Sequence, residues 1–143
     1  MTFSFGQSQH ERIEIEVLRY ERQPVGEYHD DNWLTVQVRV RVDGFRGTVD
    51  GAFITEELVA FLGQLRPLYQ SLSGMAEFTT MEGQLHLRLT GNGKGRIELV
   101  GEVADQPGIG NRLKFTLLFD QSQLGASIHE LERVTSEFPI RAV

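Results

Sequence analysis

Four side chains that could bind a metal ion lie close together early in the chain. They are Glu27, His29, Asp30 and Asp31, and carboxylates with an imidazole can hold a hard cation or zinc. Their spacing does not match a calcium-binding EF-hand loop, and polar residues just before a strand usually form an ordinary solvated loop. We therefore predict no metal ion and no other cofactor.

The same segment could instead recognise a protein. Tyr28 and Trp33 accompany the acids, and aromatic side chains anchor interfaces while acidic ones attract a basic partner. In a simpler interpretation, Trp33 only covers the core where a strand starts. We predict a partner-binding patch made of Glu27, Tyr28, Asp30, Asp31 and Trp33.

Signs of catalysis are few. The chain has no cysteine, no Gly-x-Ser-x-Gly nucleophile elbow and no His-Glu-x-x-His metal motif. His86 is expected on one exposed strand face, and Arg39, Arg41 and Arg46 are expected on another, with Arg41 directly opposite Arg46. Such like charges repel unless an anion or nearby acids offset them. We predict that the protein is not an enzyme, and an enzyme built from these residues ranks behind the binding functions.

The segment Gly91–Gly95 has the composition of a phosphate-binding loop but not its context. A P-loop needs Ser or Thr after the lysine and a helix behind it, whereas Lys94 is followed by Gly95 and a strand pattern. This segment therefore predicts a hairpin turn.

These residues must be positioned by strands. Trp33–Val42 alternates strictly between apolar and polar residues, which is typical of a half-buried strand. Asp43-Gly44 follows, and this dipeptide favours a two-residue hairpin turn. The turn sets the register, with Val42 opposite Phe45, Val38 opposite Val49 and Leu34 opposite Phe53.

Three further hairpins are predicted between residues 76 and 120, because their apolar faces and opposite charges match across each turn. An earlier strand is indicated by Ile13, Ile15 and Val17, and the residues before it are expected to be loose. The expected apolar pairs are Phe78–Leu87, Ala76–Leu89, Leu89–Ile97, Leu87–Leu99, Leu99–Leu117 and Gly101–Phe115.

Two segments have helical periodicity. The first is predicted to begin with Thr55 as N-cap, to kink at Pro67 and to stop at Gly74. The second is predicted to begin with a capping box of Asp120 and Gln123.

Two glycines, Gly47 and Gly51, fall on the apolar face of a strand. A missing side chain lets another element approach closely, so we expect a helix to lie there. A small-molecule pocket between the sheet and the helix that contains Pro67 would fit the same pattern.

Together these elements predict an α+β fold, with a largely antiparallel sheet of about seven strands and two helices packed on one face. The length of 143 residues and mass of 16.2 kDa predict a single domain over residues 1–143.

The charge is acidic and uneven. The chain carries 20 acidic and 14 basic side chains, and residues 1–65 hold 11 of the acids against 6 bases. Nucleic-acid binding rests on Lys and Arg facing phosphates, so we expect no nucleic-acid partner. With no signal-peptide pattern, no apolar stretch of about 20 residues and no cysteine, a cytoplasmic protein without membrane contact is expected.

Several segments of the chain read like one known family. These are Asn32-Trp33-Leu34, Phe61–Arg66, Ser71–Gly74, Glu82–Leu85, Leu87–Gly91 and Gly110–Leu113. Over nearly all of residues 32–138 the chain resembles the WapI-type bacterial immunity proteins. The resemblance implies neutralisation of a cognate toxin delivered in contact-dependent competition, and no motif residue carries over as a toxin contact.

The leading hypothesis is therefore a non-enzymatic cytoplasmic immunity protein whose partner is a cognate protein toxin. The alternative is a small-molecule-binding domain. The sequence leaves open whether the chain also forms a homodimer.

Overall fold

The computed structural model describes residues 1–142. Eight strands form two antiparallel four-stranded sheets. The first sheet contains β1 (Thr2–Ser8), β2 (Glu11–Tyr20), β3 (Trp33–Val42) and β4 (Phe45–Ile54). The second contains β5 (Ser73–Thr79), β6 (Leu85–Asn92), β7 (Arg96–Ala104) and β8 (Arg112–Asp120). Each sheet is followed by a long helix, α2 (Thr55–Ser71) or α3 (Gln121–Glu137), and α1 (Tyr28–Asp31) is a single turn before β3.

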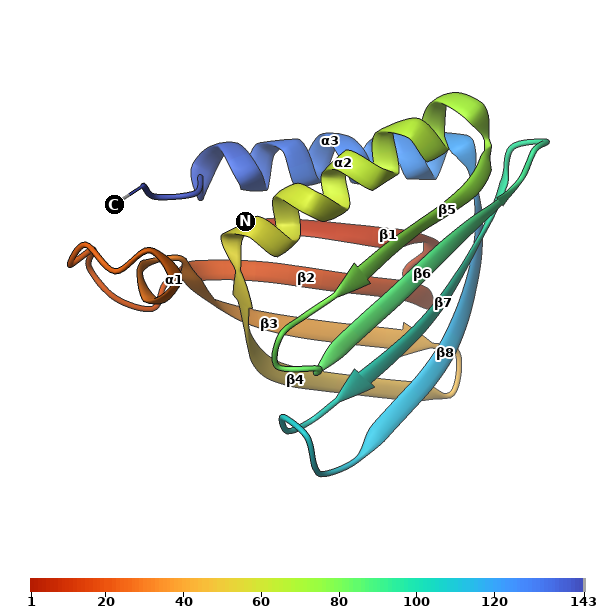
Figure 1. Ribbon diagram of the computed structural model, residues 1–143. Helices are drawn as coiled ribbons and strands as arrows, with labels where there is room; N and C mark the ends of the chain where they lie inside the picture. Colours follow the sequence, from red (N-terminus) through yellow and green to blue (C-terminus); the bar gives the residue numbers. More distant parts are fainter. Residues whose placement is uncertain (143) are drawn as a thin grey trace.

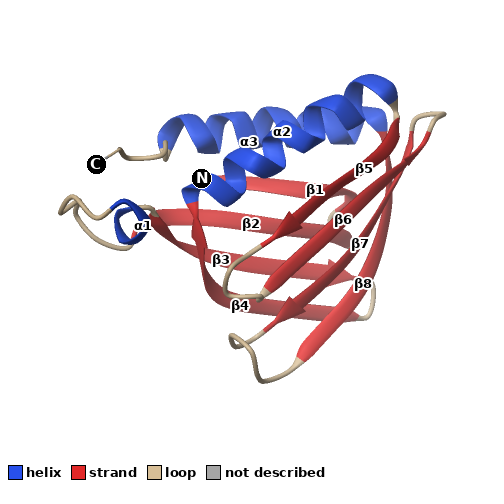
Figure 2. Cartoon of the chain, viewed as in Figure 1, coloured by secondary structure: helices blue, strands red, loops and turns tan. Residues whose placement is uncertain are grey.

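The two long helices lie side by side and close one side of the molecule (Figure 1). Helix α2 packs along β5, and α3 packs along β1. On the opposite side lie the last strands of the two sheets, β4 and β8 (Figure 2). The α+β class, the antiparallel pairing and the two packed helices are confirmed, but the strands number eight in two sheets instead of about seven in one.

The core lies between the sheets and beneath α2. Phe61 of α2 lies 5.8 Å from Phe5 of β1 and 5.0 Å from Phe78 of β5, measured between ring centroids. Phe53 of β4 lies 5.2 Å from Phe78. These rings fill the space beneath α2, and a surface hollow of about 300 Å³ remains between α2 and β5.

Strand β1 was not predicted, because its alternation of polar and apolar residues covers only Thr2–Phe5 and stops at Gly6. Phe3 and Phe5 face the core, but Ser4 between them is also buried. Helix α3 covers this outer side, where Glu130 accepts hydrogen bonds from the backbone N–H and the hydroxyl of Ser4, each at 3.0 Å. Both faces of β1 are therefore buried at this point, and the polar side chain on the outer face, Ser4, is bonded by α3.

The predicted registers of β3–β4, β5–β6 and β7–β8 are confirmed. That of β6–β7 was wrong by two residues, since Leu89 pairs with Leu99, and Leu87 with Gly101. The turn is centred on Lys94, one residue later than expected, and the carboxamide oxygen of Asn92 accepts the N–H groups of Lys94 (2.8 Å) and Arg96 (3.1 Å) there.

The helix ends differ from the prediction at α2 and agree at α3. Ile54, not Thr55, is the N-cap of α2, because the Glu57 carboxylate accepts the Ile54 N–H at 2.7 Å. The left-handed residue that ends α2 is Leu72 (φ 61°), before Gly74. At α3, Asp120 accepts the N–H of Gln123 at 3.0 Å, as predicted.

No helix covers Gly47 and Gly51, contrary to the prediction. A Cβ atom at Gly47 would have open space around it. At Gly51 it would lie 3.3 Å from the side-chain oxygen of Gln84. Gln84 lies in the turn just before β6 and donates to the backbone carbonyls of Asp50 in the first sheet (3.0 Å) and Ala104 in the second (3.3 Å), so it ties the two sheets together.

Candidate functional site

The loop between β2 and α1 is built around one carboxylate. The side chain of Asp31 accepts the backbone N–H groups of Val25 (3.0 Å), Gly26 (2.8 Å) and Glu27 (2.9 Å), and it pairs with Arg22 at 3.3 Å. Asp31 is only 3% exposed. Burial by itself would raise the pKa of Asp31, but these N–H groups and Arg22 hold it below its ordinary value.

The C-terminal segment holds this loop in place through the contacts of Arg141. The guanidinium of Arg141 donates to the backbone carbonyls of Arg22 (2.9 Å) and Asp31, and it lies over the ring of Tyr20 at 3.7 Å. Buried Asn32 exchanges two hydrogen bonds with the backbone of Arg141, at 2.7 and 2.9 Å. The loop conformation therefore depends on residues more than 100 positions away.

The five residues of the predicted patch have different surroundings. Glu27 and Asp30 are exposed, near Arg22 at 3.2 and 4.0 Å. Asp31 faces the loop backbone, so its carboxylate is not open to a partner. Trp33 is half-buried on the outer face of the first sheet and is not part of the core.

Tyr28 connects α1 to the start of α2. A hydrogen bond to Glu56 raises the pKa of the Tyr28 phenol above its ordinary value, and burial adds to the rise. Tyr28 also packs edge-on against His29, with ring centroids 5.4 Å apart. Its aromatic face is thus held in place and partly open, as an interface anchor requires.

The sequence analysis missed three acids that join this surface. Glu56 and Glu57 lie in the first turn of α2, and Glu82 lies in the β5–β6 turn. Burial raises the pKa of Glu57, and the nearby charges of Glu82 and Glu56 add to this rise, whereas hydrogen bonds from two backbone N–H groups oppose it. One of those N–H groups belongs to Met81, at 2.6 Å from the carboxylate.

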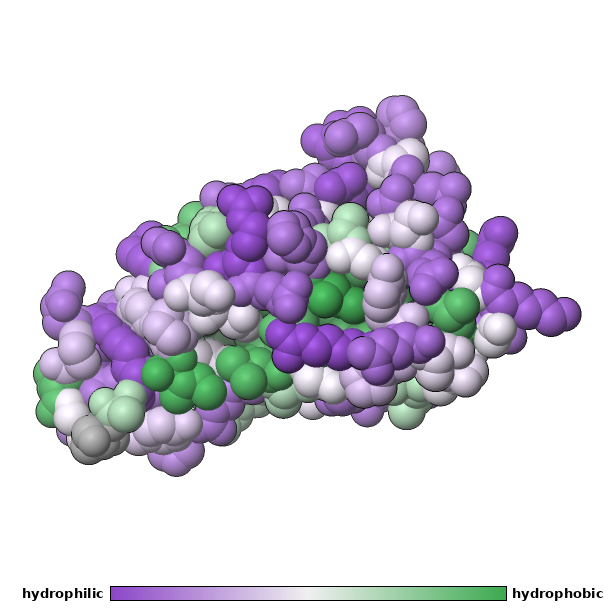
Figure 3. Space-filling view, turned by 90° about the horizontal axis from the view of Figure 1, so that it is seen from above, coloured by the Kyte–Doolittle hydropathy of each residue, from purple (hydrophilic) through white to green (hydrophobic). Residues whose placement is uncertain are grey.

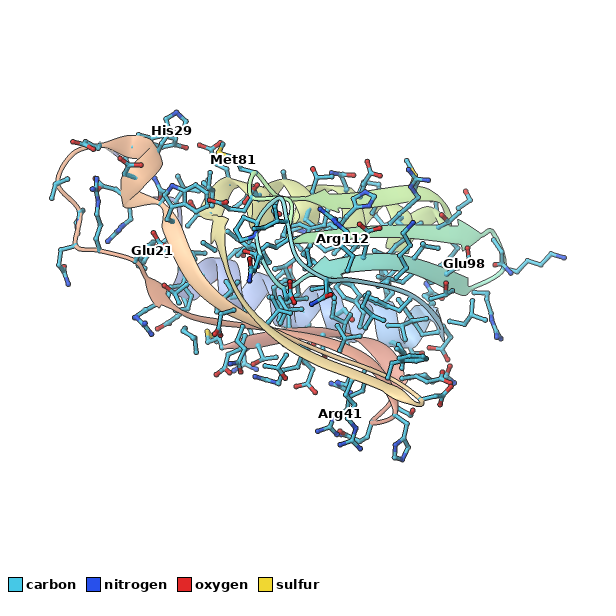
Figure 4. The ribbon with its side chains drawn as sticks, turned by 90° about the horizontal axis from the view of Figure 1, so that it is seen from below. Glu21, His29, Arg41, Met81, Glu98 and Arg112 are labelled. Atoms are coloured by element: carbon cyan, nitrogen blue, oxygen red, sulfur yellow. The ribbon has the colours of Figure 1, made fainter. Side chains whose placement is uncertain are left out.

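These contacts define one surface, which we call the acidic end. Figure 4 shows Glu21, His29 and Met81 at the same end of the molecule, with Glu98 at the other. Two apolar side chains project among the acids, Val25 (65% exposed) and Met81 (70% exposed). By contrast, the helix-covered side is mostly hydrophilic, with its apolar residues in small separate groups (Figure 3). The acidic end consists of Val25, Glu27, Tyr28, Asp30, Glu56, Glu57, Met81 and Glu82.

The four suggested metal ligands do not share a centre, since Asp31 is turned toward the loop backbone. Within residues 1–142, no three histidine or acidic side chains are arranged so that they could hold a metal ion.

The other polar groups form surface ion pairs. Glu77 accepts from His86 at 3.0 Å and from Arg88 at 3.2 Å. The hydrogen bond with His86 has the largest effect, and with the bond from Arg88 it holds the pKa of Glu77 below its ordinary value. Glu77 therefore stays ionised and is not suited to act as a general acid. On the first sheet, Arg39 pairs with Glu16 at 3.0 Å and Glu14 at 3.4 Å.

Comparison with known proteins places the chain in a family. The model of the WapI-like immunity protein family matches residues 4–139. The chain belongs to this immunity protein family. The match confirms the resemblance and extends it over β1, which the sequence motifs did not include. No curated protein matches the chain.

Two solved structures share the fold of this WapI-like protein. The plant transcriptional regulator PBF-2 is similar with a TM-score of 0.52 and 11% identity, over 96% of this chain and 81% of that one. MRP1/MRP2 from Trypanosoma is similar with a TM-score of 0.50 and 13% identity, over 96% and 86% of the two chains. At such low identity the likeness concerns the fold alone.

The helices of the WapI-like chain give one further finding. Within residues 1–142, no helix is both long and apolar enough to cross a membrane.

Proposed function

We propose that this protein is a cytoplasmic, non-enzymatic immunity protein that binds and neutralises a cognate toxin protein. Membership of the WapI-like immunity protein family is the observation that carries the proposal. The function requires a surface that recognises another protein, and the chemistry of the acidic end supports this surface for that role.

The chemistry of the acidic end favours a basic toxin. Exposed Glu27, Asp30 and Glu56 attract positive charge, and opposite charges across an interface raise the association rate. Val25 and Met81 offer apolar area among these charges. Charge thus directs the encounter, while the aromatic and apolar side chains supply the contact area that holds the complex.

The rigidity of the surface supports the same role. Asp31, Arg22 and Arg141 fix the loop that carries Glu27 and Asp30. A loop that is already ordered loses less conformational entropy when a partner binds. Asp31 therefore contributes by shaping the loop and not by contact.

The test uses this protein and the toxin domain encoded next to its gene. We expect the protein to protect cells that express the toxin and to bind the purified toxin domain. Reversing two charges in Glu27→Lys/Asp30→Lys should slow association about tenfold at low salt, with a smaller difference at high salt because salt screens exposed charges. Stopped-flow measurements give both rates.

The matched control is Glu11→Lys/Glu98→Lys, which changes the net charge equally at exposed positions away from the acidic end. We expect less than a twofold change in its association rate. Absence of both protection and binding in the unaltered protein would overturn the proposed function. If the two double variants change the association rate equally, toxin binding still stands as the function, but the binding site is not the acidic end.

A further inference from the structure

We propose that the free edge of β4 is a second docking site, which binds an extended strand of a partner protein with alternating apolar and acidic side chains. The site lies at the open side of the molecule, away from the helices. It does not depend on the toxin or on the acidic end.

The first observation is an unpaired strand edge. Strand β4 is the last strand of its sheet. In an antiparallel hairpin with a two-residue turn, the backbone groups of alternate residues point away from the paired strand. Here Phe45, Gly47 and Val49 bond to β3, so the N–H and C=O groups of Arg46 and Thr48 point outward.

The contact of Gln84 confirms this alternation and ends the free edge. Its side chain donates to the carbonyl of Asp50 from the outer side. Asp50 alternates along β4 with Thr48 and Arg46. The carbonyl groups of Thr48 and Arg46 therefore point to the same outer side as that of Asp50. The open stretch is therefore short, from Phe45 to Val49.

The second observation is an apolar groove beside this edge. It has a volume of about 300 Å³ and lies between β4 and the start of β8. Phe45, which is 65% exposed, Gly47 and Val49 line one wall, and Val103 and Leu113 line the other. A strand added to β4 would place alternate side chains in this groove, and they must be apolar.

The third observation is a row of arginines on the outer face. Arg12 of β2 lies opposite Arg41 of β3, and Arg41 lies opposite Arg46 of β4. Within residues 1–142, neither Arg41 nor Arg46 forms an ion pair, whereas Arg12 lies 3.8 Å from Glu14. Like charges in neighbouring strands repel one another.

The row ends at the free edge, and this sets the charge of the occupant. A strand added beside β4 places an outer side chain next to Arg46, and an acidic one there offsets the repulsion. A basic strand would lengthen the unfavourable row. Backbone hydrogen bonds, the groove and the arginine row thus select the same occupant, an apolar and acidic strand.

The test is an NMR titration of this protein with two peptides. The probe is the acetylated and amidated peptide Thr-Ile-Glu-Ile-Glu-Val-Thr, and the control carries Lys in place of both Glu residues. We expect saturable shifts of the Arg46 and Thr48 amides with the Glu peptide and at least about fivefold weaker binding of the Lys peptide. Equal binding of the two peptides, or no shift at this edge, would overturn the proposal.

Two protein variants separate the edge from the charge. Thr48→Pro removes a backbone N–H group that points away from β3. An edge strand tolerates proline at such a position, and the variant should no longer show the peptide-induced shifts. If this variant does not fold, Arg46→Glu is the second test and should reverse the preference in favour of the Lys peptide. An unchanged preference would overturn the proposal. Sedimentation that showed a dimer without peptide, with the Thr48 amide protected, would also overturn it in favour of a second copy of the chain.

Discussion

Asp31 was predicted to contact a partner protein, but its carboxylate holds the backbone of its own loop. Its neighbours in the sequence, Glu27 and Asp30, are exposed, whereas its carboxylate accepts three backbone N–H groups and Arg22. The lowered pKa of Asp31 follows from these bonds to its ionised form. The residue therefore organises the surface without lying on it.

Acid should release this loop before it unfolds the core. Because the pKa of Asp31 is lower in the folded protein, its ionised form stabilises the fold at neutral pH, and this stabilisation is lost as the pH falls below about 4. Hydrogen exchange of the Val25, Gly26 and Glu27 amides should accelerate over that range.

The variant Asp31→Asn provides the control. Its amide group cannot accept all the bonds that the carboxylate accepts, so the three amides should exchange fast already at pH 7 and change little with acid. A wild-type transition centred at the ordinary pKa of an aspartate would contradict the interpretation.

At the scale of elements, close contacts at glycines decide how the strands pack. Gly101 of β7 lies opposite Leu87 and Phe115. A Cβ atom at Gly101 would lie 2.3 Å from the Phe115 ring. Strand β7 therefore needs glycine at this position for the ring to lie on it.

Replacing Gly101 by alanine should lower the free energy of unfolding by about 1–3 kcal/mol, because Phe115 must move from its place in the core. Urea denaturation measures the change. Gly63→Ala is the matched control, since Gly63 lies on the exposed side of α2 with open space around it. That substitution should raise the free energy of unfolding by about 0.5–1 kcal/mol. Equal stability of Gly101→Ala and the wild type would show that the ring adapts without cost.

At the scale of the whole molecule, the fold separates a closed side from an open one. Helices α2 and α3 cover β5 and β1, and β4 and β8 are left at the opposite side (Figure 1). The acidic end brings together α1, the first turn of α2 and the β5–β6 turn. Both proposed docking surfaces therefore arise from the arrangement of the two halves and not from one segment.

The C-terminal segment joins the halves, and this can be tested at Arg141. Arg141→Ala removes the bonds to the carbonyls of Arg22 and Asp31, so hydrogen exchange in residues 22–31 should accelerate about tenfold or more, while the core strands keep their protection. The exposed Arg133→Ala variant is the control and should leave residues 22–31 unchanged. Faster exchange throughout the core would indicate global destabilisation instead.

Local pattern was enough to predict most of the elements. Alternation and turn residues predicted β3 and β4 with their register, and the capping box predicted the start of α3. These features depend on residues that are near one another in the chain, so the sequence contains them directly. Family membership could likewise be recognised from motifs in the turns and on the helix face.

Only the tertiary structure decided which surfaces these elements form. The burial of Asp31 depends on the loop backbone and on Arg141, the strand nature of β1 depends on α3, and the acidic end depends on three turns meeting. Apart from the bonds of Asp31 to its own loop, each of these contacts joins residues that are far apart in the chain. Alternation along a single segment carries no information about such neighbours, because the side-chain period is the same whatever packs against it.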